Sequence, residues 1–325
     1  MPQEIMSNLF CIGIPLPKNP LRILNSYVIK GEDRNLVIDT GFKLPECEAA
    51  LRQGLLELDI DLNKTDFFIT HLHSDHSGLV PALVTENSRV YLSRIEIPWM
   101  FGDTRDALWA GDRVKFQRAG FSEEELSHLW KAPDRKLSPI REFEDYLPVD
   151  DGDIFEYGGY RLKAVETPGH TPAHMCLWME DQKTMFTGDH LLFDITPNIT
   201  HWDEIDDSLG SYLDSLRMTD KFDVQLALPG HRETGDFHAR TAELLSHHEL
   251  RLDESLEIVR KNPGLNIYDI AGKMSWKIRC NSWEDFPITQ KWFAVGECHS
   301  HLRHLEKRGL IKADYGEMVL HYYAT

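Results

Sequence analysis

The segment FFITHLHSDHSG, residues 67–78, constrains the fold of this chain more than any other. It begins in an apolar stretch, since residues 66–70 are largely aromatic and β-branched, which predicts a buried strand. Side chains two positions apart point to the same side of a strand, so His71 and His73 are expected to face the same way just beyond its end. The strand therefore presents a pair of imidazoles at its end.

Two further ligand-type side chains follow in the same loop. Asp75 and His76 are expected on the turn that begins a helix over residues 77–86. Imidazole and carboxylate groups bind zinc and iron well, so the strand–loop–helix junction is interpreted as a metal site. The alternative is a polar surface turn, because a chain with 16 histidines clusters some of them by chance.

Ligand-type residues recur at the ends of other predicted strands. They are Asp39 in VIDTG, His170 in TPGHTPAH, Asp189 in TMFTGDH and His231 in LALPGH. Glycines precede His170 and His231, and a glycine allows close approach of the backbone. A single histidine near a glycine is more often an ordinary loop residue, but several such positions in this order strengthen the prediction of a metal site.

Strand and helix patterns alternate through the first 240 residues. Predicted strands cover 23–31, 35–41, 66–70, 89–93, 154–157, 160–167, 174–180, 183–189 and 222–231, and predicted helices cover 45–58 and about 207–218. The strand over 174–180 and the strand over 183–189 are expected to form a hairpin. Both halves end their strands in ligand-bearing loops, which indicates two sheets flanked by helices.

Residues 94–147 differ in character and are interpreted as a mostly helical insertion. The segment combines many charges with aromatic residues, and SEEEL at 122–126 is typical of a helix start. Its aromatics, in particular Trp99, Phe101 and Trp109, either line a substrate pocket or anchor the insertion to the body of the protein.

The last 80 or so residues form a further pattern. Helices are predicted over 245–261, 267–274 and 289–308, followed by a short hairpin within 309–324, which is the order of three helices and a wing. Asn-Pro-Gly at 262–264 marks the end of the first helix.

Charge and cysteine content narrow the function classes. The net charge is −18, and residues 245–325 hold 11 Lys and Arg against 11 Asp and Glu, so all of the excess negative charge lies in 1–244. An acidic body is a poor partner for a polyphosphate backbone. The five scattered cysteines suggest reduced thiols in a cytoplasmic protein. The sequence has no apolar run of ~18 residues for a membrane span and no start typical of a secretory signal.

The ordered ligand residues resemble those of the metallo-β-lactamase-fold hydrolases. The resemblance covers about residues 9–240 and implies an α/β fold, the αββα sandwich, with ligands on loops at one edge of two sheets. It also implies a catalytic domain over 1–240 with the helical insertion at about 94–147. Residues 241–325 would then form a separate small domain.

Carried over to this sequence, the resemblance assigns a role to each ligand. One metal ion would be held by His71, His73 and His170, a second by Asp75, His76 and His231, with Asp189 bridging both. Asp39 would support the site from behind the ligands. His174 and His190, adjacent to ligands, would either act in the pocket or be packed, supporting residues. A hydroxide bridging two divalent ions would be the nucleophile, and Asp75 is the residue expected to orient it.

Several departures distinguish branches of the family. A carboxylate at Asp189 differs from the lactamases that have cysteine there, and His73 differs from the glutamate of flavodiiron oxygen reductases. HSGL has one glycine where glyoxalase-type thioesterases usually have two. The tail segment TQKWFAVGECHSHLRHLEKRGLI resembles the last helix and wing entry of a winged-helix domain, a combination similar to a subgroup with thioester hydrolases and single-strand ribonucleases. The neutral tail favours a lid over a nucleic-acid reader.

These observations predict a dinuclear, metal-dependent hydrolase that cleaves a thioester or ester of a small or acyl-chain substrate. The alternatives are a single-strand endoribonuclease, a mononuclear iron persulfide dioxygenase and a non-enzymatic, metal-stabilised winged-helix binding protein. The expected cofactors are two divalent ions, Zn²⁺ with iron or manganese as alternatives. The expected partner is a small-molecule substrate rather than nucleic acid or a membrane, and the sequence leaves a homo-oligomer open.

Overall fold

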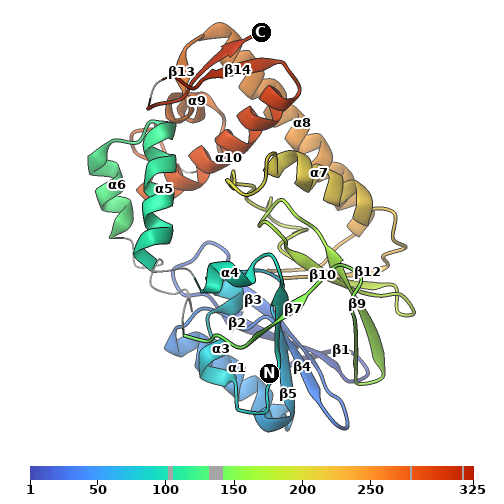
Figure 1. Ribbon diagram of the computed structural model, residues 1–325. Helices are drawn as coiled ribbons and strands as arrows, with labels where there is room; N and C mark the ends of the chain where they lie inside the picture. The colour runs from blue at the N-terminus through green and yellow to red at the C-terminus, as the bar shows by residue number, and fades with distance from the viewer. Residues whose placement is uncertain (102–104, 132–141, 279, 317) are drawn as a thin grey trace. The chain divides into compact units, whose positions relative to one another are not determined.

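The computed structural model describes residues 1–101, 105–131, 142–278, 280–316 and 318–325 (Figure 1). The chain forms two compact units. One, here called the sandwich unit, comprises Met1–Gly102, Lys136–Pro197 and Ser215–Thr241; the other, the helical unit, comprises Asp103–Arg135, Asn198–Asp214 and Ala242–Thr325. Each unit is therefore assembled from segments that are far apart in the sequence.

The first sheet of the sandwich unit has seven strands in sequence order. They are β1 (Gln3–Met6), β2 (Leu9–Pro15), β3 (Ile23–Ile29), β4 (Asn35–Ile38), β5 (Thr65–Phe68), β6 (Val90–Ser93) and β7 (Tyr146–Val149). Strands β1 to β4 pair antiparallel, whereas β4 to β7 pair parallel, so the sheet is mixed.

The second sheet has five strands in the order β12-β11-β10-β9-β8. They are β8 (Ile154–Tyr157), β9 (Tyr160–Glu166), β10 (Met175–Met179), β11 (Thr184–Gly188) and β12 (Leu226–Pro229). The pairs β8–β9, β9–β10 and β10–β11 are antiparallel, and β11–β12 is parallel. The predicted hairpin is thus confirmed as β10 and β11.

Alternating side chains of the first sheet enter two hydrophobic cores. In β5, Phe67 packs into the core that also contains Leu51 of α1 (Pro45–Glu57), while Phe68 packs into the core shared with the second sheet. Strand β3 divides Val28 and Ile29 in the same way. Side chains alternate between the two faces of a strand. A strand that is buried on both faces therefore packs against the second sheet on one side and against helices on the other. The structure therefore confirms two mixed sheets flanked by helices.

The helical unit contains the remaining long helices and a small third sheet. Its helices include α5 (Arg105–Ala119), α6 (Glu123–Trp130), α9 (Ile267–Lys273) and α10 (Ile288–Lys307). In its sheet, β15 (His321–Ala324) lies between β13 (Leu265–Asn266) and β14 (Ile311–Asp314). The chain crosses between the units within α7 (Ser208–Thr219) and α8 (Phe237–Lys261). Among the described residues, no helix is long and apolar enough to cross a membrane.

Aromatic contacts show why α5 and α6 join the C-terminal helices. Phe116 packs against Trp292 with ring centroids 5.6 Å apart, and Phe121 packs edge-to-face on Tyr268 at 5.0 Å. Helix α6 begins with a capping box, in which the side chains of Ser122 and Glu125 each accept a hydrogen bond from the other residue's backbone N–H.

The helix expected over 77–86 is wrong in extent. The structure has two short helices instead, α2 (Ser74–Ser77) and α3 (Val80–Leu83). The helix breaks because the backbone N–H of Leu79 donates to Thr40 Oγ1 at 3.2 Å, and because Pro81 has no N–H to continue the ladder. A further one-turn helix, α4 (Ile97–Met100), follows β6.

Candidate metal centre

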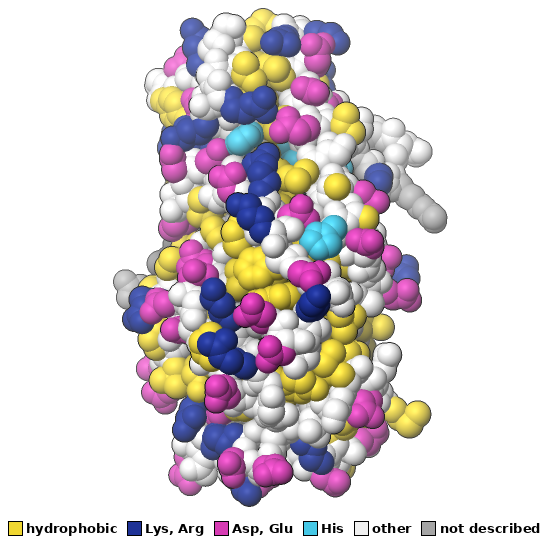
Figure 2. Space-filling model, turned by 90° about the vertical axis from the view of Figure 1, so that its right-hand side faces the viewer, with side chains coloured by type: hydrophobic (Ala, Val, Ile, Leu, Met, Phe, Trp, Pro, Cys, Tyr) yellow, Lys and Arg dark blue, Asp and Glu magenta, His cyan; other side chains and the backbone are white. Residues whose placement is uncertain are grey.

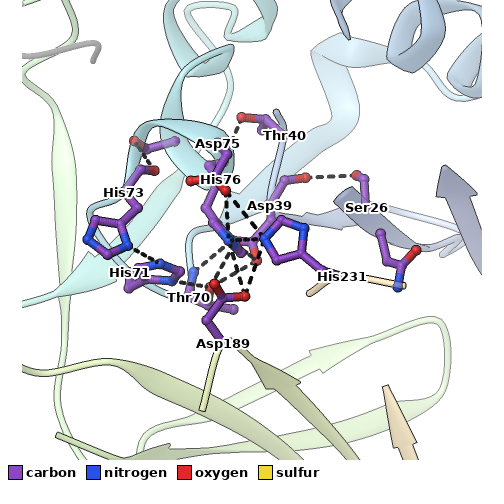
Figure 3. Close-up of polar contacts among 12 residues, drawn as sticks. Ser26, Asp39, Thr40, Thr70, His71, His73, Asp75, His76, Asp189 and His231 are labelled. Carbon is purple, nitrogen blue, oxygen red and sulfur yellow. Dashed lines mark hydrogen bonds and ion pairs between the residues drawn. The ribbon is translucent and has the colours of Figure 1, made fainter. Parts of the chain in front are cut away.

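The candidate site lies where strands from both sheets end (Figure 3). In the first sheet, β4 and β5 are parallel neighbours, and Asp39 and His71 follow their ends. In the second sheet, the parallel strands β11 and β12 end just before Asp189 and His231. Ends of parallel neighbours meet at one edge of a sheet, so the topology brings residues separated by up to 192 positions into one place.

Backbone contacts join the two sheets at this edge. Asn25 of β3 donates its N–H to the carbonyl of Gly230 at 2.7 Å, and the hydroxyl of Tyr27 donates to the carbonyl of Pro229 at 2.8 Å. Leu24 and His231 form an isolated antiparallel bridge. The loop after β12 is therefore held against the first sheet.

Three histidines form the first ligand group. The Nδ1 atom of His73 lies 3.0 Å from Nε2 of His71 and 3.1 Å from Nε2 of His170. His71 and His170 are buried, and His73 is partly exposed. The three nitrogens therefore converge from the loop after β5 and the loop between β9 and β10.

The second group consists of Asp75, His76 and His231. The Nε2 atoms of the two histidines lie 3.3 Å apart, and Asp75 Oδ2 lies 3.3 Å from Nε2 of His231 and 3.9 Å from Nε2 of His76. The structure thus brings together the members of each trio that the family resemblance assigns to one metal ion.

Asp189 lies between the two groups. Its Oδ1 is 3.4 Å from Nε2 of His76 and 3.4 Å from Nε2 of His231, whereas its Oδ2 is 3.6 Å from Nε2 of His170. Oδ1 is buried and makes no hydrogen bond. Each carboxylate oxygen therefore faces a different trio.

Hydrogen bonds at the other ring nitrogens set the orientation of the ligand histidines. Asp39 accepts from Nδ1 of His76 at 2.7 Å and from the backbone N–H of Thr70 at 2.9 Å. His231 donates from Nδ1 to the carbonyl of Ile23 at 2.8 Å. In both histidines the occupied Nδ1 leaves Nε2 to face the centre, which is the usual arrangement of a metal-ligating imidazole.

Two glycines leave room for these side chains. A Cβ on Gly230 would lie 2.7 Å from Asp189 Oδ1 and 2.9 Å from His76 Cε1. Gly188 has a φ of +46°, and a Cβ there would lie 2.5 Å from Nε2 of His174. Only a residue without a side chain fits these positions, because the neighbours are packed rather than free to move.

His174 and His190 lie next to the ligands but belong to neither trio. His174 accepts the backbone N–H of Asp189 at Nε2, at 3.1 Å, and its Nδ1 lies 2.8 Å from the hydroxyl of Thr167. His190 contacts the hydroxyl of Thr219 at 2.9 Å. The structure therefore places His174 where it positions the backbone of Asp189, and His190 against α7.

The electrostatics of the two trios differ. Burial lowers the pKa of His71 well below its usual value and that of His73 to about 3, so both rings are neutral at physiological pH. Burial also opposes the charged form of His76 and His231, but the carboxylates around them outweigh it and raise both pKa values. In the absence of a cation the second trio therefore holds protons.

The carboxylates remain ionised. Burial by itself would raise the pKa of Asp75 and of Asp189, but His76 and His231 lower the first to about 2 and the second well below its usual range. Imidazole nitrogens and two ionised carboxylates make a donor set suited to divalent ions that accept nitrogen and oxygen ligands. The residues present therefore fit a metal centre.

One buried residue of the site has little sequence signal. Glu96, between Ile95 and Ile97, is fully buried, and its carboxylate accepts the backbone N–H groups of Leu72 and Ala173. Burial raises its pKa to about 7. A lone acidic residue in an apolar segment is the only hint of such burial in the sequence.

The aromatics expected to line a pocket lie in and just after α4 and in α5. Phe101 packs against the core beneath α1 and lies 6.3 Å from the ring of Tyr146, as expected of an anchor. Trp99, in α4, is partly buried. The side chain of Trp109 lies outside the described residues.

Comparison with known proteins defines the class that this fold and site represent. The sequence profile of the Metallo-beta-lactamase superfamily matches residues 20–231, and the chain belongs to this superfamily of α/β metallohydrolases. It is thus an enzyme of the metallo-β-lactamase fold, a hydrolase with a candidate His/Asp metal site.

Individual relatives and structures are more distant. The chain is 24% identical over 315 residues to the lactamase-like protein nscB of Aspergillus fumigatus, covering 83% of this chain and 78% of that protein. It is 29% identical over 216 residues to an atrochrysone carboxyl ACP thioesterase of Emericella nidulans, covering 66% of this chain but only 53% of the relative.

Two solved structures share the fold over nearly the whole chain. A metallo-beta-lactamase family protein of Thermus thermophilus superposes with a TM-score of 0.82 at 24% identity, over 99% of this chain and 100% of that one. A beta-lactamase domain protein from Burkholderia ambifaria gives 0.83 at 23% identity, over 100% and 93%.

Proposed function

We propose that this protein is a dinuclear metal-dependent hydrolase that cleaves thioesters of small or acyl-chain substrates. The observation that carries the proposal is Asp189, whose two oxygens face different ligand trios and whose Oδ1 is buried without a hydrogen bond. A single tetrahedral ion needs four ligands, and this site offers seven. Zinc is the proposed metal, with iron or manganese as alternatives.

The bound ions would polarise the acyl carbonyl and lower the pKa of a coordinated water. The chain's own residues do the rest. His71, His73 and His170 would hold one ion, Asp75, His76 and His231 the other, and Asp189 would bind both. Asp75 is the most accessible member of the second trio, with 12% of its side chain exposed, and its ionised carboxylate would orient the attacking water by accepting a hydrogen bond from it. The water oxygen bonds to the acyl carbon, the C–S bond breaks, and the products are a carboxylic acid and a thiol.

The choice of a thioester has two supports. Relatives at 29–30% identity over 66% of this chain are atrochrysone carboxyl ACP thioesterases, although the chain spans about half of their length. The charge balance also disfavours RNA: the net charge is −18, and Asp and Glu side chains lie among the Lys and Arg side chains on the face in Figure 2.

Three further features belong to the proposal. Residues 241–325 are proposed to form a winged-helix-like domain, supported by the order of α8, α9, α10 and the β14–β15 hairpin. Trp99 is proposed to contribute to the acyl pocket. A cytoplasmic location is supported by five free cysteines.

A metal analysis combined with a substrate screen tests this function. Purified protein is expected to contain two equivalents of divalent metal and to hydrolyse acyl-CoA and acyl-pantetheine thioesters, with loss of activity on chelation. Asp75→Asn should lower kcat much more than KM. A chain that binds one equivalent, unchanged by Asp75→Ala, or that cleaves single-stranded RNA but no thioester, would refute the proposal.

A further inference from the structure

The carboxylate of Glu96 joins two loops that are about 100 residues apart in the sequence. Its Oε2 accepts the backbone N–H of Leu72 at 2.7 Å. Its Oε1 accepts the backbone N–H of Ala173 at 3.0 Å and the hydroxyl of Thr171 at 2.5 Å. A single buried side chain thus holds the loop after β5 and the loop between β9 and β10 at a fixed separation.

These two loops carry the first ligand trio. Leu72 lies between His71 and His73, and Thr171 follows His170 directly. The second trio is supported by other groups, since His76 donates to Asp39 and His231 to the backbone carbonyl of Ile23. Asp75 and His76 of the second trio lie further along the loop after β5, so the contacts of Glu96 bear most directly on the first trio.

The chemistry of the three donors requires a carboxylate. Both oxygens of a carboxylate accept hydrogen bonds, so one side chain can serve N–H groups on two loops. A glutamine has one acceptor oxygen, and its NH₂ group would face a backbone N–H on the other loop. Because a buried donor left without a partner costs about 1–3 kcal/mol, that loop would shift to find another acceptor.

We propose that Glu96 is a positioning residue that sets the spacing of His71, His73 and His170. It thereby affects the metal affinity of this trio more strongly than that of the second trio. The inference rests on the proposed dinuclear centre, but Glu96 itself touches neither substrate nor metal ligand side chain.

A double-mutant design separates the two trios. In an Asp75→Ala background the first trio is the intact group, whereas in a His73→Ala background the second is. Zn²⁺ affinity is measured by competition with a chromophoric chelator. Glu96→Gln is expected to lower the affinity about 10–100-fold in the first background and less than about 2-fold in the second, in line with losses of supporting partners at other metal sites.

Two controls keep the test specific. Glu166→Gln removes a half-buried carboxylate whose charge interacts with Glu96, and it should leave both affinities unchanged. Thr171→Val removes one of the three contacts of Glu96, and it should produce a smaller loss in the Asp75→Ala background only. If Glu96→Gln does not fold, this milder variant carries the test.

Amide hydrogen exchange of the metal-free protein provides a second readout. Glu96→Gln or Thr171→Val should accelerate exchange at Ala173, and Glu96→Gln also at Leu72, with Glu166→Gln as the control. Equal affinity losses in both backgrounds, or unchanged affinity and unchanged exchange, would overturn the role of Glu96. If neither background binds Zn²⁺, the dinuclear proposal fails, and the exchange result alone decides the role of Glu96.

Discussion

Replacing Asp189 by alanine tests the dinuclear centre most directly. Asp189 contacts both trios, with Oδ1 at 3.4 Å from His76 and His231 and Oδ2 at 3.6 Å from His170. His231 contributes to one trio. Asp189→Ala should therefore weaken the binding of both ions, whereas His231→Ala should weaken the binding of one.

The magnitude follows from comparison with weaker perturbations. Loss of a residue that merely supports a ligand costs about 10–100-fold in metal affinity, and loss of a ligand should exceed this. A loss above about 100-fold corresponds to more than about 2.7 kcal/mol for each ion. Asp189→Ala is thus expected to cost more than about 5 kcal/mol over two ions, and His231→Ala about half as much.

Zinc titration with a competing chelator, followed by elemental analysis after gel filtration, measures both quantities. Wild-type protein should retain two equivalents, His231→Ala one, and Asp189→Ala less than one. Asp189→Asn is the matched control, because it keeps the shape and one carbonyl oxygen while removing the charge. It should fall between wild type and alanine. Retention of two tightly bound ions by Asp189→Ala would refute the bridging role.

Three further predictions concern the site and its substrate. Gly230→Ala should displace Asp189 and His76 and lower the Zn²⁺ affinity at least about tenfold, as loss of a supporting residue does. The control Gly111→Ala, whose Cβ would meet nothing within 4 Å, should leave the affinity unchanged. Equal affinities of the two variants would contradict the steric role of Gly230. Zn²⁺ binding should release protons near neutral pH and tighten as pH rises, because the raised pKa values of His76 and His231 keep them protonated without a cation; calorimetry in buffers of different ionisation enthalpy measures this, and zero release would contradict it. Thioester hydrolysis should depend weakly on salt from about 50 to 200 mM, unlike the roughly 10³–10⁵-fold loss of a protein with many phosphate contacts; a steep decline in kcat/KM would favour a polyanionic substrate.

Much of the sandwich unit could be predicted from local patterns. The strands predicted at 66–70 and 183–189 end at or just before ligand-type residues, and β5 and β11 formed there. A strand buried on both faces needs a continuous apolar run, which is visible in any single sequence. The identities of the ligand-type residues are equally local, because imidazole and carboxylate are chemical properties of each side chain.

Features that depend on distant partners escaped sequence reasoning. The helix expected over 77–86 broke because Thr40, almost 40 residues earlier, accepts the N–H of Leu79. The grouping of α5 and α6 with the C-terminal helices depends on pairs such as Phe116 and Trp292. Neither contact has a periodicity, so neither leaves a pattern in the sequence.

The sequence by itself determined which side chains could bind metal and at which strand ends they would lie. Only the tertiary structure decided their geometry: the two oxygens of Asp189 facing different trios, the space beside Gly230, and the carboxylate of Glu96 between two loops. The physical reason is the distance along the chain between the residues that interact. Strand formation follows from neighbours in the chain, whereas the separation of ligand atoms to within a few tenths of an ångström is set by hydrogen bonds and packing between segments that meet only when the two sheets close on each other.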